Sequence, residues 1–119
     1  MTNKKTSRTE GIFTIYQLRQ GESTRDFRFM PYEYLEKKGF SVCEENYRRI
    51  YTAPIDETTC TPDAIMTKFN IFIPMDFKGH SLSVSDIVTL AADGETKAYY
   101  VDSFDFKEIV FDETCVVCE

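Results

Sequence analysis

The segment Ile87-Val-Thr-Leu-Ala-Ala-Asp-Gly-Glu-Thr-Lys-Ala-Tyr-Tyr-Val101 decides the fold. Two runs rich in β-branched and aromatic residues, 87–91 and 97–101, flank a short polar turn. Asp93 and Gly94 readily adopt the positive φ angles that a tight hairpin turn requires. The sequence therefore predicts an antiparallel β-hairpin, the best-signalled element of the chain.

Three further stretches have the composition of strands. The run Ile12-Phe-Thr-Ile-Tyr-Gln-Leu18 places large side chains on both sides, which predicts a strand partly buried on both faces. Residues 47–53 predict a second strand, which Pro54 ends. The aromatic and aliphatic residues between 104 and 111 supply further core, and Cys115-Val-Val-Cys118 is interpreted as a short last strand.

Two short helices are predicted between the strands. Pro31 suits a first helical turn, and Gly39 suits the left-handed end of that helix. Thr61 can cap a second helix, which Asn70 is expected to close by adopting a positive φ angle. The order of elements predicts an α+β fold, with a mostly antiparallel sheet and the two short helices packed on one face.

The length of 119 residues suits one hydrophobic core. We expect residues 1–10, which are polar and show no periodicity, to form a disordered tail, and residues 11–119 to form a single domain. No apolar run approaches the roughly 18 residues that cross a bilayer, and the first residues lack the apolar stretch of a signal peptide. We therefore expect a soluble cytoplasmic protein without a membrane partner.

The net charge is −6, and acidic residues are concentrated toward the end of the chain. Residues 82–119 contain nine acidic and two basic residues. A protein that binds nucleic acid through its phosphates needs the opposite charge, so no direct nucleic-acid partner is expected. One interpretation is a solvated acidic face that maintains solubility; the other is a surface complementary to a basic partner.

The sequence contains no recognisable catalytic or metal-binding motif. Cys115 and Cys118 form a CxxC pair, but zinc needs two more ligands at suitable spacing, and Cys43 and Cys60 do not supply it. A redox CxxC usually begins a helix, and this one lies in a Val-Val run. Zinc and redox roles are the alternatives to the unligated cysteines that we expect. With His80 as the single histidine, we predict no metal, no cofactor and no enzymatic activity.

Two features have both a structural and a functional interpretation. In the strand 47–53, Tyr47, Arg49 and Tyr51 alternate with the remaining residues, and tyrosines beside arginines can form a stacking surface for nucleic acid. A packed aromatic face with arginines reaching into water is the interpretation that we favour. His80 could act as a general base, but without a motif to orient it we favour a hydrogen-bonded structural histidine.

Several motifs occur together along most of the chain. They are Thr24-Arg-Asp-Phe-Arg-Phe29 with Pro31-Tyr32, Tyr51-Thr-Ala-Pro54, Lys68-Phe-Asn70, Asp76-Phe-Lys-Gly-His-Ser-Leu-Ser-Val-Ser-Asp-Ile-Val88 and Ala98-Tyr-Tyr-Val-Asp-Ser-Phe104. Through them, residues 12–111 resemble the YodL-like domain family. One departure is Asp105, which stands where the family pattern has glycine between two phenylalanines and argues against a tight positive-φ turn at that position.

The resemblance implies a genetic context more than a mechanism. YodL-like domains resemble cargo of conjugative elements and plasmids in Gram-positive bacteria, which implies a mobile genetic element and the cytoplasm of a bacterial host cell. Small acidic proteins of such elements are often host-defence inhibitors, including anti-restriction and anti-CRISPR proteins. An RNA-guided nuclease holds its guide–target duplex in a positively charged channel, which an acidic protein could occupy.

Our first hypothesis is a non-enzymatic protein that inhibits a CRISPR effector nuclease by blocking its guide RNA or target DNA site. The residues expected to bind this basic partner are five acids and two aromatic anchors: Asp102, Asp105, Glu108, Asp112, Glu113, Tyr99 and Tyr100. The alternative is a non-inhibitory accessory module that binds other proteins of the conjugation machinery. A weak nuclease that uses His80 or Asp102 is the least favoured interpretation.

Overall fold

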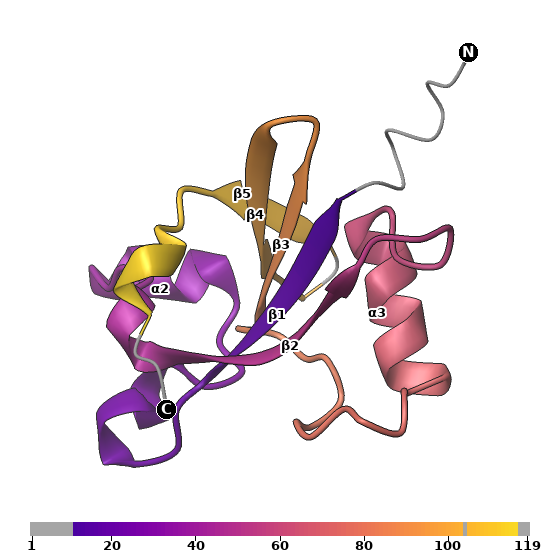
Figure 1. Ribbon diagram of the computed structural model, residues 1–119. Helices are drawn as coiled ribbons and strands as arrows, with labels where there is room; N and C mark the ends of the chain where they lie inside the picture. Colours follow the sequence, from indigo (N-terminus) through magenta and orange to yellow (C-terminus); the bar gives the residue numbers. More distant parts are fainter. Residues whose placement is uncertain (1–10, 104, 117–119) are drawn as a thin grey trace.

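The centre of the structure is a five-stranded antiparallel sheet in the order β2-β1-β3-β4-β5 (Figure 1). Its strands are β1 (Ile12–Leu18), β2 (Tyr47–Pro54), β3 (Ile87–Ala92), β4 (Glu95–Val101) and β5 (Phe106–Ile109). This computed structural model describes residues 11–103 and 105–116. The predicted hairpin is confirmed as β3 and β4, and its turn residues Asp93 and Gly94 have φ angles of 57° and 75°.

Strand β1 occupies the middle of the sheet, between β2 and β3. Every residue from Phe13 to Leu18 is buried, so the prediction of a strand covered on both faces is confirmed. Its neighbours come from distant parts of the sequence, because Ile12 lies opposite Pro54 on one side and Ala91 on the other. The strand therefore joins the two halves of the sheet.

The pairing of β1 with β2 contains a β-bulge. Ile15 lies opposite Tyr51 and Tyr16 lies opposite Arg49, so Ile50 has no partner in the register. The extra residue interrupts the alternation of faces along β2. As a result Tyr47 and Tyr51 pack in different core clusters, and the predicted alternation that put both tyrosines on one face is wrong.

Two α-helices cover the sheet, α2 (Tyr32–Lys38) and α3 (Pro62–Ile71). Leu35 of α2 packs in the same cluster as Tyr16, whereas Phe69 of α3 packs in the same cluster as Phe13. The antiparallel sheet with two helices confirms the predicted α+β fold, but the helices lie on opposite faces and not on one (Figure 1). The reason is that the inner strands are apolar on both sides, so both faces need cover.

The helix ends follow local capping chemistry in most places. Gly39 ends α2 in the left-handed conformation, as predicted. Thr61 caps α3 by accepting a hydrogen bond of 3.1 Å from the backbone N–H of Ala64. The prediction for Asn70 is wrong, since α3 continues to Ile71 and the Asn70 amide donates instead to the Met66 carbonyl at 2.9 Å.

An irregular connector joins α3 to β3 and packs partly on the core, as its broken apolar pattern indicates. Phe77 contacts the core cluster around Phe69. Before β3, the predicted tight turn is present: the Asp86 backbone N–H donates to the Ser83 carbonyl at 3.1 Å, and Ser85 has a φ angle of 87°. This turn brings the polar end of the connector against β1.

Short 3-10 helices occur at η1 (Glu22–Phe27), η2 (Glu44–Asn46) and η3 (Glu113–Cys115). Because η3 contains Cys115, the prediction of a last strand beginning at that residue is wrong. The predicted tail at residues 1–10, Phe104 and Cys118 lie outside the described residues. Among the described helices, none has the length and apolar character needed to cross a membrane.

Candidate functional site

The predicted partner-binding acids are held in different ways, beginning with Asp102 at the end of β4. Its Oδ1 accepts hydrogen bonds from the backbone N–H groups of Tyr32 at 3.1 Å and Ser103 at 2.9 Å. The carboxylate thus accepts a hydrogen bond from the backbone N–H of the first residue of α2, which has no acceptor within the helix. Asp102 is half-buried and serves first to attach α2 to the sheet.

Glu113 is half-buried, and its carboxylate contacts two strands of the sheet. Its Oε2 accepts hydrogen bonds from the Tyr16 hydroxyl at 2.6 Å and the Thr89 hydroxyl at 2.7 Å. Burial and this acidic neighbour both raise the pKa of Tyr16 well above its ordinary range. Glu113 therefore anchors η3 to the α2 face of the sheet and is not free to meet a partner.

Three of the predicted acids are exposed around the edge strand β5. Asp105 precedes the strand, Glu108 lies within it and Asp112 follows it. Hydrogen bonds from Thr114, through both its hydroxyl and its backbone N–H, hold the pKa of Asp112 below its ordinary value. We call Asp105, Glu108 and Asp112 the acidic edge.

The two predicted aromatic anchors differ completely in exposure. Tyr100 is 0% exposed, and its hydroxyl donates to the Met30 carbonyl at 2.6 Å, so it belongs to the core and the prediction of a surface anchor is wrong. Alternation along β4 sends Tyr99 to the other face, where it is half-buried opposite Glu108. Only Tyr99 lies beside the acidic edge.

The five predicted carboxylates are therefore divided and do not form one patch. Glu108 lies opposite Tyr99 on the face that α3 covers, whereas Glu113 contacts Tyr16 on the face that α2 covers. A single charged strip that imitates a phosphate strand would need all five on one side. Three members, Asp105, Glu108 and Asp112, are exposed, and Asp112 lies beside η2, where its backbone N–H donates to Glu44 Oε2 at 2.9 Å.

A second polar surface combines β1, β2 and the connector. It is a pocket of about 600 Å³, and its polar lining comprises Gln17, Gln20, Arg48, Arg49, Lys78 and His80. In the β1–β2 register Arg48 lies opposite Gln17, which directs both side chains to one face. The pocket is basic, in contrast to the acidic chain as a whole.

Gln17 organises the floor of this pocket. It is buried, and its Nε2 donates to the His80 carbonyl at 2.9 Å and to Asp86 Oδ2 at 3.0 Å. These two bonds use both protons of the amide nitrogen. His80 Nδ1 lies 2.7 Å from the Ser81 carbonyl, which assigns its proton to that bond and leaves Nε2 without a described partner. The hydrogen-bonded histidine matches the structural role favoured from the sequence.

Asp86 lies behind the pocket and is almost completely buried. Burial raises its pKa from 3.8 to about 7, and hydrogen bonds from the Ser83 backbone and Gln17 oppose the shift. The same carboxylate closes the Ser83 turn, with Ser83 N–H donating to Oδ2 at 2.9 Å. The network Gln17–His80–Asp86 thus fixes the connector to β1.

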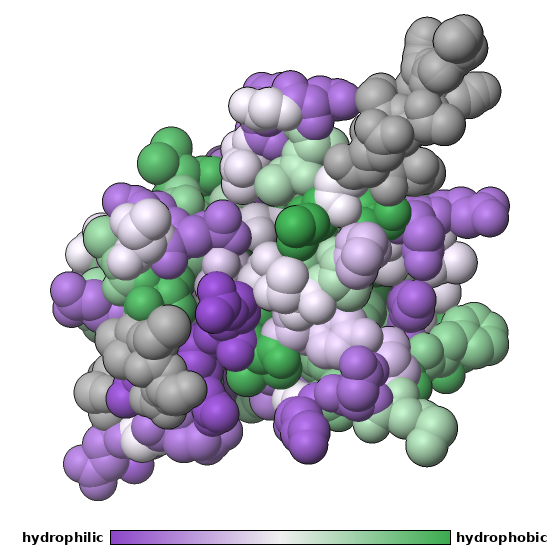
Figure 2. All heavy atoms as spheres, viewed as in Figure 1, coloured by the Kyte–Doolittle hydropathy of each residue, from purple (hydrophilic) through white to green (hydrophobic). Residues whose placement is uncertain are grey.

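An apolar surface lies at the end of α3. Ile71, Phe72, Ile73 and Met75 are all exposed, with Phe72 at 70%. Figure 2 shows green, hydrophobic spheres gathered at the lower right, where α3 ends in the same view. We call residues 71–75 the apolar segment. Exposed apolar side chains that lie together are typical of surfaces that bind other proteins.

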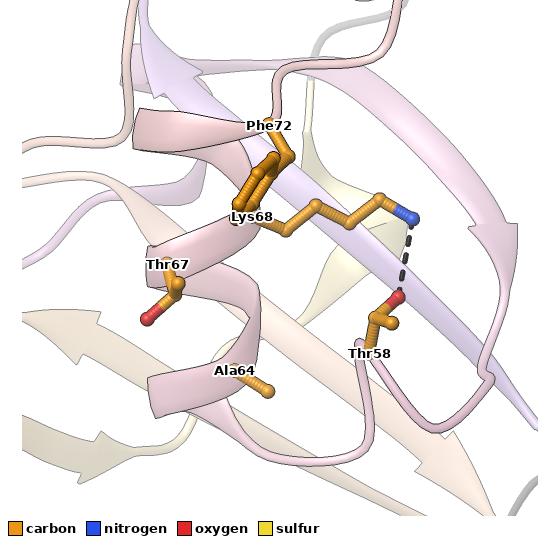
Figure 3. Close-up of a pocket in the computed structure, with 5 residues that line it drawn as sticks. All are labelled: Thr58, Ala64, Thr67, Lys68 and Phe72. Atoms are coloured by element: carbon orange, nitrogen blue, oxygen red, sulfur yellow. Dashed lines mark hydrogen bonds between the residues drawn. The ribbon is translucent and has the colours of Figure 1, made fainter.

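A pocket of about 370 Å³ lies next to the apolar segment, between α3 and the loop before it (Figure 3). Phe72 stands at one end, and the Lys68 side chain reaches from the helix to the loop, where Nζ donates to Thr58 Oγ1 at 3.2 Å. The aliphatic part of Lys68 thereby covers the pocket with apolar atoms. No reactive group in its lining points to chemistry.

The described part of the chain contains no group of three or more His, Cys, Asp or Glu side chains arranged to hold a metal ion. Cys43, Cys60 and Cys115 are free, and the proposed partner of Cys115 in the CxxC pair, Cys118, lies outside the described residues. The zinc and redox alternatives for that pair are therefore not tested by the described residues.

Sequence reasoning missed the basic pocket. Its residues lie in three separate segments, which the β1–β2 pairing and the hydrogen bond from Gln17 to the His80 carbonyl bring together. The available signals were the Arg48-Arg49 pair and the long block from Asp76 to Val88, which contributes Lys78 and His80 to the lining and Asp86 behind it. Neither signal by itself indicates a pocket.

Comparisons with known proteins identify the family of the chain. The model of the YodL-like domain matches residues 12–111, which covers every strand of the sheet. No curated protein and no solved structure shows significant similarity to the chain. The match extends over most of the sequence and contains both the acidic edge through Glu108 and the basic pocket. The chain therefore belongs to the YodL-like domain family.

Proposed function

We propose that this protein is a non-enzymatic inhibitor, encoded by a mobile genetic element, that blocks the guide RNA or target DNA site of a CRISPR effector nuclease. The observation that carries the proposal is the acidic edge, where Asp105, Glu108 and Asp112 are exposed around strand β5. Tyr99 lies beside Glu108 and offers an aromatic contact.

Electrostatic complementarity supports this choice of partner. The channel of an RNA-guided nuclease is lined by basic residues that bind the phosphates of the guide–target duplex. Carboxylates on an acidic protein increase the rate of encounter with such a channel and select against acidic partners. Strand β5 is also an edge strand, so its outer backbone groups can pair with a partner's strand.

The direct experiment mixes the purified protein with a CRISPR effector, with and without guide RNA, and measures complex formation and DNA cleavage. Inhibition at a small molar excess supports the proposal. The absence of both a complex and any loss of cleavage, across the effector classes tested, would contradict it.

Charge-reversal variants test which surface binds. The double variant Asp105→Lys and Glu108→Lys should slow association about tenfold at low salt and less at high salt. The matched control reverses Glu36 and Glu57, which are exposed and lie outside the acidic edge. An equal effect of both variants would show that overall charge, and not the acidic edge, drives binding.

The alternative, a non-inhibitory accessory module of the conjugation machinery, is favoured by the apolar segment. Four exposed apolar residues within residues 71–75 are suited to a stable contact that does not depend on a basic channel. A pull-down that yields relaxase or coupling proteins, and that is lost in Phe72→Ser but retained in Glu108→Lys, would favour this alternative.

A further inference from the structure

The basic pocket between β1, β2 and the connector is a second surface, separate from the acidic edge and independent of the inhibitory function proposed above. We propose that it binds a small phosphorylated molecule of the nucleotide class. The inference depends on the convergence of its cations, on its rigid floor, on its size and on the opposite charge of the remaining chain.

The cations come from two segments that the fold brings together. Arg48 of β2 lies opposite Gln17 and faces the pocket with it, and Lys78 belongs to the connector, close to His80. Arg49 lines the pocket beside Arg48, although its register partner is Tyr16 on the other face. None of the three cations forms an ion pair with a carboxylate of the described residues, and no acidic side chain lines the pocket. Like charges that lie together without counterions repel one another, so an anion bound between them would be stabilised.

The fold constructs this pocket through two specific features. The unpaired residue Ile50 interrupts the alternation of β2 next to the two arginines, and bulges of this kind commonly redirect side chains at binding sites. Gly79 allows the connector to approach β1: a Cβ atom there would overlap with Gln17 Oε1 and would lie 2.8 Å from Cγ2 of Ile50. Glycine is therefore required for the present position of Lys78 and His80.

The floor is already rigid without a ligand. Gln17 is 3% exposed and holds the His80 carbonyl and Asp86 through its amide. His80 keeps its Nδ1 directed to Ser81, so Nε2 is available to a ligand at the rim. A site fixed before binding loses less conformational entropy when the ligand arrives.

Chemistry and size indicate the ligand class. Guanidinium groups match phosphate oxygens through paired hydrogen bonds, and the lysine adds a point charge. A volume of about 600 Å³ is within the range of small-molecule sites and exceeds the need of inorganic phosphate. Leu18 and Ile50 in the lining provide apolar surface for an uncharged part such as a nucleoside. The net charge of −6 opposes the approach of long nucleic acids, which favours a small ligand.

The experiment is a titration of the full chain, labelled with ¹⁵N, with ADP, inorganic phosphate, adenosine and a short single-stranded RNA. We expect saturable shifts for ADP at Gln17, Gly79 and His80, and binding at least about tenfold weaker for phosphate and for adenosine. No saturable shift with ADP up to about 10 mM would overturn the proposal. Equal binding of ADP and phosphate would contradict the nucleotide class. Tighter binding of RNA than of ADP would overturn the proposal and show that the pocket binds nucleic acid.

Matched variants locate the site. The double variant Arg48→Gln and Lys78→Gln should weaken ADP binding about tenfold or more, because it removes two charge-assisted contacts. The control Lys38→Gln and Lys97→Gln removes the same charge at exposed positions outside the pocket and should change binding less than about twofold. Dispersed spectra confirm that each variant folds. An equal loss in the control would show only nonspecific attraction and would overturn the site.

Discussion

The acidic edge and the basic pocket show two different ways in which a chain assembles charge. The acids are dense in the sequence, but the sheet separates them, and Asp102 and Glu113 bind backbone or hydroxyl groups of other elements. The cations are sparse in the sequence, but the sheet gathers them around one pocket. Local charge density is thus a poor guide to a charged surface, because strand pairing decides which side chains meet.

The largest expected effect tests the difference between two neighbouring tyrosines of β4, the buried Tyr100 and Tyr99, which lies beside the acidic edge. Tyr100→Ala should lower the free energy of unfolding by about 4 kcal/mol, because it removes a completely buried ring. Tyr99→Ala should cost less than about 1.5 kcal/mol, since that side chain is half-buried. Chemical denaturation of both variants measures this. Similar losses would mean that Tyr99 is also a core residue and not an anchor.

A smaller effect tests the construction of the basic pocket. Gly79→Ala should lower the free energy of unfolding by about 2 kcal/mol, because the added methyl group overlaps with Gln17. The same variant should weaken ADP binding by moving Lys78 and His80. Thermal unfolding and the ADP titration check the two results, and an unchanged stability would show that the connector does not press on β1.

The buried carboxylate behind the pocket gives a pH dependence of similar size. In the folded protein the pKa of Asp86 is raised from 3.8 to about 7, so the unfolded chain loses this proton first as pH rises. Asp86 therefore contributes a decrease in stability between about pH 4 and pH 7. Asp86→Asn abolishes the titration, and its stability relative to the wild type should increase by about 3 kcal/mol over that interval. A constant difference between the two proteins, measured by urea denaturation at each pH, would show that Asp86 stays ionised.

The smallest effect distinguishes the hydrogen-bonded acid Glu113 from the exposed acid Glu108. Glu113→Ala leaves the hydroxyls of Tyr16 and Thr89 without their acceptor and should cost about 1.5 kcal/mol. Glu108→Ala, at an exposed position, should change stability by less than about 0.5 kcal/mol. If Glu108→Ala lowered the free energy of unfolding more than Glu113→Ala, Glu108 would be a structural residue and would not belong to an exposed binding surface. Urea denaturation at neutral pH resolves the difference.

Much of the fold was predictable because its signals are local. The Asp93-Gly94 turn, the glycine at the end of α2 and the Thr61 cap each depend on residues within a few positions. The placement of the helices on opposite faces was not predictable in this way. It depends on which strands lie in the centre of the sheet, and that order is set by pairing across about 70 residues.

The site was less predictable for the same reason. The bulge at Ile50 changes the face of Tyr47, and nothing in the local composition marks the extra residue. The burial of Tyr100 followed from alternation along β4 once one face was known, but the sequence did not say which of the two adjacent tyrosines was inside. The basic pocket required the complete register of β1 against β2.

The central position of β1 also has a consequence for biosynthesis. This strand leaves the ribosome early, yet its partner β3 ends at Ala92, so translation must supply about 75 more residues before the sheet can close. At about 5–20 residues per second, the nascent strand waits roughly 4–15 s with its apolar side chains uncovered. Chaperones that bind extended apolar segments have this interval in which to act on the newborn chain.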